Sequence, residues 1–348
     1  MILPSGSQLQ GGRYRIEREL GHGGFGYTYL ATQTGLNRKV AIKEFFMLNY
    51  CERDANTSQV VFGTSVNRQF IERFRKKFLK EAQNIAMLNH PNIIRIHDVF
   101  EENGTAYYVM EYLDKGSLKD LVERKGKLSE QEALNYIKQI AAALGYIHER
   151  RMNHLDVKPG NVLIDDNDNV VLIDFGLAKQ YNEVGEQTST TPVGISHGFA
   201  PLEQYHQGGV SVFYPATDIY SLGATLYYLV VGEAPPNANI VNDEGLPEFS
   251  NSISLSIERT IKLSMQSRRT QRIQNIPDFL KVLDGKFDFL PNKVGSQNGE
   301  TFDSSKCNIP KQNTIREINN KKNIANNKEL NLFETTVADT KHAEVEVF

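Results

Sequence analysis

The chain has 348 residues, of which 40% are apolar and 23% are charged, as is normal for a globular protein. This length suffices for one two-lobed domain of about 250–300 residues or for two ordinary domains. The net charge of −3 gives no electrostatic reason to expect nucleic acid or an anionic membrane as a partner.

The N-terminal region shows no pattern of an export signal. No basic stretch is followed by a long apolar one, and the short, polar residues 1–13 are expected to be flexible. Two cysteines, Cys51 and Cys307, lie too far apart for a metal-ligand spacing, which favours a reducing compartment. We therefore expect a cytoplasmic protein.

Strand-like alternation begins at Tyr14 and leads into a glycine-rich segment, Gly21-His22-Gly23-Gly24-Phe25-Gly26. The pattern G-x-G-x-x-G is weak evidence alone, because dinucleotide-binding folds share it. A further strand pattern follows these glycines, whereas a dinucleotide-binding unit would begin a helix there. Glycines at such a turn let backbone N–H groups approach phosphate oxygens without a Cβ in the way. The segment therefore predicts a nucleotide phosphate loop, with a plain glycine hairpin as the alternative.

A long segment, about residues 44–69, separates the following strand pattern from a predicted helix over residues 70–86. One interpretation is a surface insertion, because loops tolerate lengthening at little entropic cost. The other is a docking surface, and the sequence does not decide between them. The helix carries apolar residues at helical spacing and many basic residues on its other faces. These are typical of the solvated face of an amphipathic helix, with a patch for an anionic partner as the alternative.

The following elements alternate short strands with longer helices. Strands are predicted at residues 94–100 and 106–111, joined by a turn at Asn103-Gly104, and later at 162–164 and 170–173. Ser129 and Glu132 form the pattern of a capping box, which begins a helix that runs to residue 147. The most apolar run, Ile219 to Val231, is about 13 residues long and contains Ser, Gly and Thr, so it suits a buried helix rather than a membrane span.

The chemistry is concentrated in His154-Leu155-Asp156-Val157-Lys158-Pro159-Gly160-Asn161 and in Asp174-Phe175-Gly176. This order suits phosphoryl transfer: a carboxylate to accept a hydroxyl proton, a cation for the moving phosphate, and an amide and a second carboxylate to hold metal ions. Together with Val40-Ala41-Ile42-Lys43, the motifs resemble those of the eukaryotic-type serine/threonine protein kinases found in bacteria.

The resemblance covers about Tyr14 to Leu283 and implies a role for each matching residue. Asp156 would orient and deprotonate the substrate hydroxyl, and Lys158 would neutralise charge on the γ-phosphoryl group. Lys43 would bind the phosphates of ATP, and Asn161 and Asp174 would bind Mg²⁺. The implied ATP site comprises Leu20, Gly21, His22, Gly23, Gly24, Phe25, Gly26, Thr28, Ala41, Lys43, Glu81, Met110, Glu111, Leu113 and Leu163.

Three matching positions carry further expectations. Glu81 would hold Lys43 by an ion pair; the alternative, Glu72, lies over two helical turns earlier and would need another register. Thr28 stands where the family usually has a Val that packs on adenine, and Thr has a similar shape. Leu155 stands where most members have an Arg that pairs with a phosphate on the activation loop. Its presence predicts that phosphorylation at residues 188–191, Thr188-Ser189-Thr190-Thr191, is not strictly needed.

The resemblance extends to structural motifs. Ala200-Pro201-Leu202-Glu203 is similar to the family's A-P-E motif stretched by one residue, and it implies an ion pair between Glu203 and Arg272. Asp218 matches the Asp that caps the catalytic-loop backbone. Residues 286–348 are rich in polar residues and are expected to form a disordered tail, with a weak helix on a partner as the alternative.

These observations predict an α+β, bilobal protein-kinase fold. Residues 14–111 would form a small lobe with an antiparallel sheet and one helix, and residues 112–285 a large, mostly helical lobe, with MgATP between them. The expected activity is transfer of the γ-phosphate of ATP to Ser or Thr hydroxyls of proteins, the chain itself included among candidate acceptors.

Two other classes stay open. A scaffold without catalysis would normally lack Lys43, Asp156 or Asp174. A small-molecule kinase of the antibiotic-phosphotransferase type would lack the glycine-rich segment with this lysine, the A-P-x-E segment and the apolar helix.

Overall fold

The computed structural model describes residues 2–23, 26–48, 50–62, 68–175, 179–180, 195–205, 210 and 212–286, all within one compact unit. Gly24, Phe25, the hydroxyl residues at 188–191 and the predicted tail beyond residue 286 lie outside the described residues.

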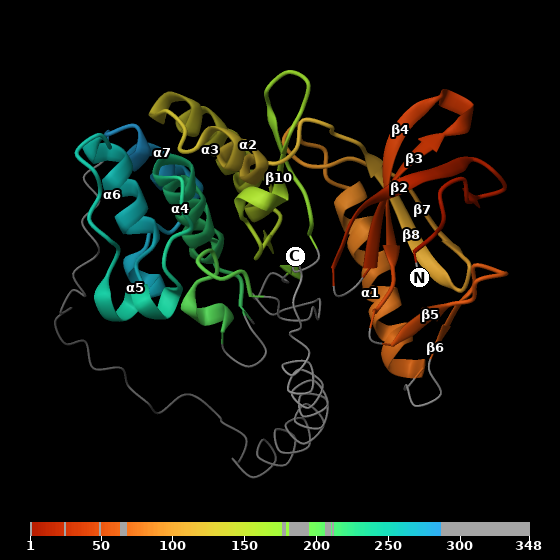
Figure 1. Ribbon diagram of the computed structural model, residues 1–348. Helices are drawn as coiled ribbons and strands as arrows, with labels where there is room; N and C mark the ends of the chain where they lie inside the picture. Colours follow the sequence, from red (N-terminus) through yellow and green to blue (C-terminus); the bar gives the residue numbers. More distant parts are fainter. Residues whose placement is uncertain are drawn as a thin grey trace, which may run out of the picture. The chain divides into compact units, whose positions relative to one another are not determined.

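The small lobe is a six-stranded antiparallel sheet with the order β1-β2-β3-β4-β8-β7 (Figure 1). Its strands are β1 (Gln8–Leu9), β2 (Tyr14–Gly23), β3 (Gly26–Gln33), β4 (Arg38–Phe45), β7 (Ile96–Glu102) and β8 (Thr105–Glu111). Helix α1 (Arg68–Ala86) contacts β7 and β8 and buries Ile71, Phe78, Ala82 and Ile85, which recur at helical spacing. The predicted antiparallel sheet with one helix is thereby confirmed.

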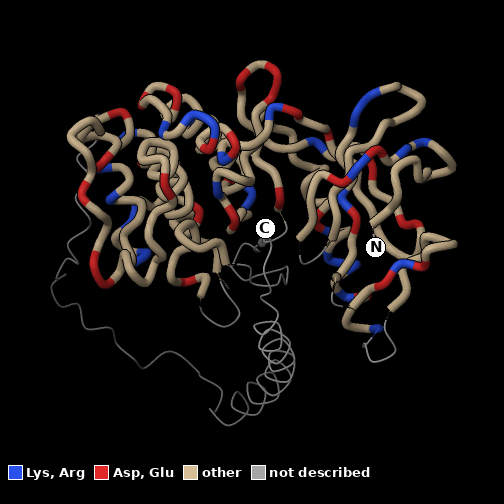
Figure 2. The backbone as a smooth tube through the Cα atoms, in the orientation of Figure 1, with Lys and Arg blue, Asp and Glu red and all other residues tan. Residues whose placement is uncertain are grey.

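Charges of both signs are interspersed over the described chain in Figure 2, including on α1. Arg75 of this helix pairs with Glu72 at 2.9 Å and with Glu101 of β7 at 2.7 Å. Part of the basic character of α1 is therefore balanced by neighbouring carboxylates.

The prediction of a flexible N-terminus is wrong for residues 2–12. Leu9 pairs with Tyr14 in the edge of the sheet, and the Gly6 N–H donates to the Ile16 carbonyl at 2.8 Å. Leu3 and Leu9 are 2% and 0% exposed. Burying a leucine contributes roughly 1.5–3 kcal/mol, which offsets the entropy of ordering a short strand.

The insertion predicted at about residues 44–69 contains a hairpin that is built into the small lobe. Strands β5 (Cys51–Arg53) and β6 (Val60–Phe62) pair with each other, and the Val60 N–H donates to the Asn103 carbonyl at 2.7 Å. Arg53 of β5 donates to both carboxylate oxygens of Glu44 at 2.6 Å. This part of the insertion therefore belongs to the core of the lobe, while a docking role remains a prediction.

The large lobe consists mainly of helices, whose bounds are α2 (Leu118–Lys125), α3 (Glu130–His148), α4 (Pro215–Val231), α5 (Ala238–Glu244), α6 (Leu255–Ser264) and α7 (Ile276–Leu283). Two short pairs of strands join them: β10 (Val162–Ile164) with β11 (Val170–Leu172), and β9 (Met152–Asn153) with β12 (Lys179–Gln180). The predicted capping box starts α3, because Ser129 accepts from the Glu132 N–H while Glu132 accepts from the Ser129 N–H.

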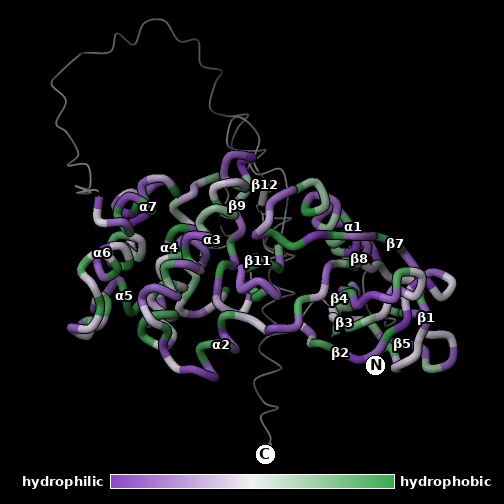
Figure 3. The backbone as a smooth tube through the Cα atoms, turned by 90° about the horizontal axis from the view of Figure 1, so that it is seen from above, coloured by the Kyte–Doolittle hydropathy of each residue, from purple (hydrophilic) through white to green (hydrophobic). Residues whose placement is uncertain are grey.

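Helix α4 is buried from Ala216 to Val230, as predicted for a core helix. Hydrophobic and hydrophilic stretches alternate along the chain in Figure 3, as expected for elements that bury one face. No helix in the described part of the chain is long and apolar enough to cross a membrane.

Gly223 lies where α4 packs on α6, and a Cβ there would stand 2.5 Å from Ser264 Cβ. We expect Gly223→Ala to lower the free energy of unfolding by about 1–3 kcal/mol, because one helix must move to accept the methyl group. Urea denaturation measures this change. The control is Gly145→Ala in α3, where a Cβ would come no nearer than 3.7 Å to Ile276. This control should be neutral or stabilising, since Ala favours helix; an equal loss in both variants would contradict the packing argument.

Candidate active site

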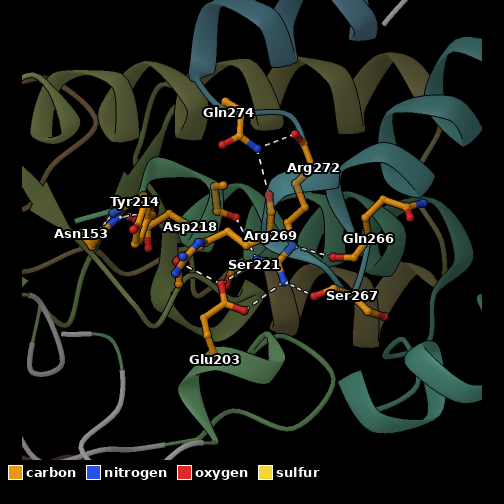
Figure 4. Close-up of polar contacts among 12 residues, drawn as sticks. Asn153, Glu203, Tyr214, Asp218, Ser221, Gln266, Ser267, Arg269, Arg272 and Gln274 are labelled. Atoms are coloured by element: carbon orange, nitrogen blue, oxygen red, sulfur yellow. Dashed lines mark hydrogen bonds and ion pairs between the residues drawn. The ribbon is translucent and has the colours of Figure 1, made fainter. Parts of the chain in front are cut away.

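The loop that carries Asp156 is fixed by the buried carboxylate of Asp218 from α4. The backbone N–H groups of His154 and Leu155 donate to its two oxygens at 2.9 and 2.8 Å. The side chains of Asn153 and His148 bind the same carboxylate at 3.0 and 2.8 Å; Asn153 and Asp218 are shown in Figure 4. Burial raises the pKa of Asp218, but these hydrogen bonds outweigh burial and hold it below its usual value. The predicted cap on the catalytic-loop backbone is confirmed.

Leu155 adopts a left-handed backbone conformation, with φ of 66°. Such a conformation costs a non-glycine residue roughly 1–2 kcal/mol and persists only where the surroundings hold it. Its N–H is bound by Asp218, and its carbonyl accepts from Gln204 Nε2 at 2.7 Å. Both polar groups of this residue's backbone are therefore satisfied by buried side chains.

Asp156 has a polar partner at each carboxylate oxygen. Oδ2 accepts from Lys158 Nζ at 2.9 Å and from Asn161 Nδ2 at 2.7 Å. Oδ1 accepts from the hydroxyl of Ser196 at 2.5 Å, and Lys158 also donates to this hydroxyl at 2.9 Å. Asp156 is 9% exposed, and its carboxylate is oriented by a cation, an amide and a hydroxyl.

Ser196 is the residue of this group that the sequence analysis missed. It lies beyond residues 188–191 and seven positions before Glu203, where a single serine carries no signal of its own. Its contact shows that Asp156 Oδ1 accepts a hydrogen bond from a serine hydroxyl in this geometry.

Lys43 and Asp174 join the two lobes. Lys43 on β4 donates from Nζ to Asp174 Oδ1 at 2.8 Å. The ammonium group lowers the pKa of Asp174 to about 2, mainly through charge attraction. Burial favours a neutral amine, but Asp174 outweighs it and raises the pKa of Lys43 well above its usual value.

The expected ion pair between Lys43 and Glu81 is not the contact that the structure shows. Lys43 donates to Asp174 instead, and Glu81 Oε1 is buried with no hydrogen-bond partner among the described residues. Burial raises the pKa of Glu81 to about 7, although the nearby Lys43 acts in the opposite direction. Glu72, the alternative partner, pairs with Arg75. The ammonium group of Lys43 lies 2.8 Å from Asp174 Oδ1, and charge attraction and a hydrogen bond favour this pair.

The sheet register brings several residues predicted for ATP binding onto neighbouring strands. Thr28 pairs with Lys43, and Ala41 pairs with Met110. Gly21 and Gly23 end β2, and Gly23 pairs with Gly26 at the start of β3. The remaining described members lie at the end of β2 (Leu20, His22), at the end of β8 (Glu111), just after β8 (Leu113) and in β10 (Leu163).

Gly26 has no room for a side chain. Its φ is 159°, and a Cβ would stand 1.8 Å from the carbonyl oxygen of Glu44 in β4. The last glycine of the motif therefore lets β3 and β4 approach closely just beside Lys43.

The predicted ion pair between Glu203 and Arg272 is confirmed. Arg272 donates from Nη1 and Nη2 to the two oxygens of Glu203 at 2.6 and 3.0 Å, and it is fully buried. It also donates to the carbonyls of Gln266 and Ser267, as Figure 4 shows. Burial alone would raise the pKa of Glu203, but Arg272 lowers it below its usual value. This contact fixes the A-P-L-E segment against the large lobe.

The family model of the protein kinase domain matches residues 14–312. PrkC of Bacillus subtilis is 35% identical over 224 residues, which are 64% of this chain and 31% of PrkC. PknA of Mycobacterium tuberculosis is 36% identical over 233 residues, which are 64% of this chain and 48% of PknA. A probable serine/threonine-protein kinase of Clostridium acetobutylicum is 32% identical over 283 residues, 78% of this chain and 39% of that protein.

The chain thus spans less than half the length of each of these relatives. Among solved structures, the apo form of PpkA-294 is similar, with a TM-score of 0.68 and 27% identity. The likeness covers 81% of this chain and 99% of that one.

Proposed function

Because the chain belongs to the protein kinase family, as a bacterial eukaryotic-type serine/threonine kinase, we propose that it transfers the γ-phosphate of MgATP to Ser or Thr hydroxyls of proteins. The observation that carries the proposal is the setting of Asp156. One of its oxygens already accepts from a serine hydroxyl, and the other is held by Lys158 and Asn161.

In this proposal Asp156 orients the acceptor hydroxyl and takes its proton as the new O–P bond forms. A serine or threonine hydroxyl is a weak nucleophile, so a fixed carboxylate at hydrogen-bond distance assists it. Lys158 Nζ, 2.9 Å from Asp156 Oδ2, provides positive charge beside the transferred group. Lys43 on β4, paired with Asp174, provides positive charge for the phosphates of ATP.

The residues present fit a Mg²⁺ ion. The amide nitrogen of Asn161 is committed to Asp156, so its Oδ1 is the atom that can bind a metal. With the carboxylate of Asp174, this makes a set of hard oxygen donors, which suits an ion that keeps water and phosphate oxygens as its other ligands. When bound, Mg²⁺ would neutralise charge on the phosphates of ATP.

The direct test is transfer of labelled phosphate from MgATP to the protein itself and to a generic basic protein, with mapping of the modified residues. Phosphoserine or phosphothreonine in either protein supports the proposal. A well-folded protein that binds ATP and transfers nothing would favour the scaffold class instead.

The absence of an Arg at Leu155 supports a second part of the proposal, weak dependence on activation-loop phosphorylation. We expect alanine at each of Thr188, Ser189, Thr190 and Thr191 to leave most of the activity, because no arginine at position 155 awaits a phosphate. Initial rates of the four single variants measure this. A loss of more than about tenfold in any one of them would contradict it, since that is about 1.4 kcal/mol of transition-state stabilisation.

Two further expectations from the sequence remain predictions. The protein would act in the cytoplasm, and residues 286–348 would form a tail outside the kinase domain. Autophosphorylation is one reaction that the labelling experiment would reveal.

A further inference from the structure

The buried side chain of Gln204 makes a hydrogen bond to the catalytic loop. It is 3% exposed, in the short helical turn Leu202–Gln204, and donates from Nε2 to the Leu155 carbonyl at 2.7 Å. Its Oε1 is buried without a hydrogen-bond partner in the part of the chain that the structure describes. The reverse orientation of the amide would place this oxygen against the carbonyl oxygen, so the network assigns the donor to Leu155. An apolar side chain of equal length would avoid the cost of a buried, unsatisfied oxygen. The amide differs from it by donating a hydrogen bond to the Leu155 carbonyl.

This bond acts on the peptide group next to Asp156. The carbonyl carbon of Leu155 is bonded to the nitrogen of Asp156, and the peptide group between them is planar. Gln204 donates to the carbonyl oxygen of Leu155 in that plane. The N–H of Leu155, on the other side of its Cα, donates to Asp218 Oδ1 at 2.8 Å. Leu155 is in a left-handed conformation that needs such support. Two buried side chains from different segments therefore fix the backbone from which the Asp156 carboxylate projects.

We propose that Gln204 is a positioning residue for phosphoryl transfer, which holds the Leu155–Asp156 peptide and thereby the direction of the Asp156 carboxylate. The inference rests on the proposed function. It also gives a physical basis for activity without activation-loop phosphorylation. The donor is a neutral amide anchored beside the Glu203–Arg272 pair, so it needs no phosphate as a counter-charge.

The test replaces Gln204 with Met, which keeps the length of the side chain and removes the donor. We expect kcat for phosphate transfer at saturating MgATP and acceptor to fall by roughly 10–100-fold, because small misplacements of a reacting group are costly. The KM for ATP should stay within about twofold, since no described contact joins Gln204 to the residues predicted for ATP. Because no ground-state contact with ATP is removed, this split between kcat and KM marks a positioning role.

A matched control is Gln139→Met in α3. Gln139 Oε1 accepts from Asn92 Nδ2 at 3.0 Å and from the Val170 N–H at 2.9 Å, so this variant also loses hydrogen bonds of a glutamine, outside the site. It should lower the melting temperature and leave kcat unchanged. Should the Met variant fail to fold, Gln204→Leu offers a smaller apolar side chain that also lacks the donor, with the same expected loss in kcat.

The outcomes separate the two proposals. A kcat loss of tenfold or more in a folded Gln204 variant, with the control near the wild type, supports the inference. A smaller loss, an equal loss in Gln139→Met, or a fall in kcat matched by a rise in KM for ATP overturns it. A wild-type protein that transfers no phosphate to any protein acceptor overturns the proposed function itself, before Gln204 is considered.

Discussion

Asp156→Asn is expected to lower kcat for phosphate transfer by roughly 10²–10⁴-fold, the range for loss of a general base. The amide has the shape of the carboxylate, but it cannot take up the hydroxyl proton. It also places an N–H₂ group where two hydrogen bonds from Lys158 and Asn161 now converge on Oδ2, or where Ser196 donates to Oδ1. The measurement is the initial rate of phosphate transfer at saturating MgATP and acceptor.

The matched control is Asp166→Asn, which removes the same charge from a side chain that is 83% exposed and only 3.6 Å from Lys115. This variant should transfer phosphate at the rate of the wild type, because exposed ion pairs of this kind contribute little. The affinity of the Asp156→Asn variant for ATP, measured by titration with a fluorescent nucleotide, should remain close to that of the wild type. A rate of phosphate transfer by Asp156→Asn within a few-fold of the wild-type rate would contradict the assignment of Asp156 as the base.

The elements and contacts that follow from local pattern were predictable. Alternation with a period of two located β2 and β3, the turn at Asn103-Gly104 located the start of β8, and the Ser129–Glu132 spacing located the start of α3. The Glu203–Arg272 pair and the cap by Asp218 followed from the family resemblance, because each depends on the fold as a whole. Motif spacing alone would not have paired residues so far apart in the chain.

Other features depend on contacts that no local pattern records. The motifs predict that Lys43 pairs with Glu81, but its contact with Asp174 follows from the distances between these side chains in the folded chain. The sequence around Leu3 and Leu9 predicts a flexible terminus, because the pairing of β1 with β2 that orders it is not visible in the local pattern. The roles of Ser196 and Gln204 likewise follow only from their hydrogen bonds to the catalytic loop.

Arg53→Ala is expected to lower the free energy of unfolding by about 3–5 kcal/mol, because it leaves a buried charge without its partner. Arg53 and Glu44 have side chains that are 2% and 0% exposed, and the guanidinium group reaches both carboxylate oxygens at 2.6 Å. Tyr29 and Tyr107 also donate to this carboxylate, each at 2.7 Å, yet neither brings a positive charge. Urea denaturation, fitted as a two-state transition where it is one, measures the loss.

Two comparisons distinguish a buried charge from simple loss of contacts. The double variant Glu44→Gln with Arg53→Ala removes both charges, so it should be more stable than Arg53→Ala although it carries one more substitution. Lys119→Ala breaks an exposed pair with Glu123 at 3.5 Å and should change stability by less than about 1 kcal/mol. A double variant no more stable than Arg53→Ala would mean that packing, rather than charge, holds the insertion. Since Glu44 follows Lys43 on β4 and faces the opposite side of the sheet, the same ion pair also anchors the strand that presents the lysine to the site.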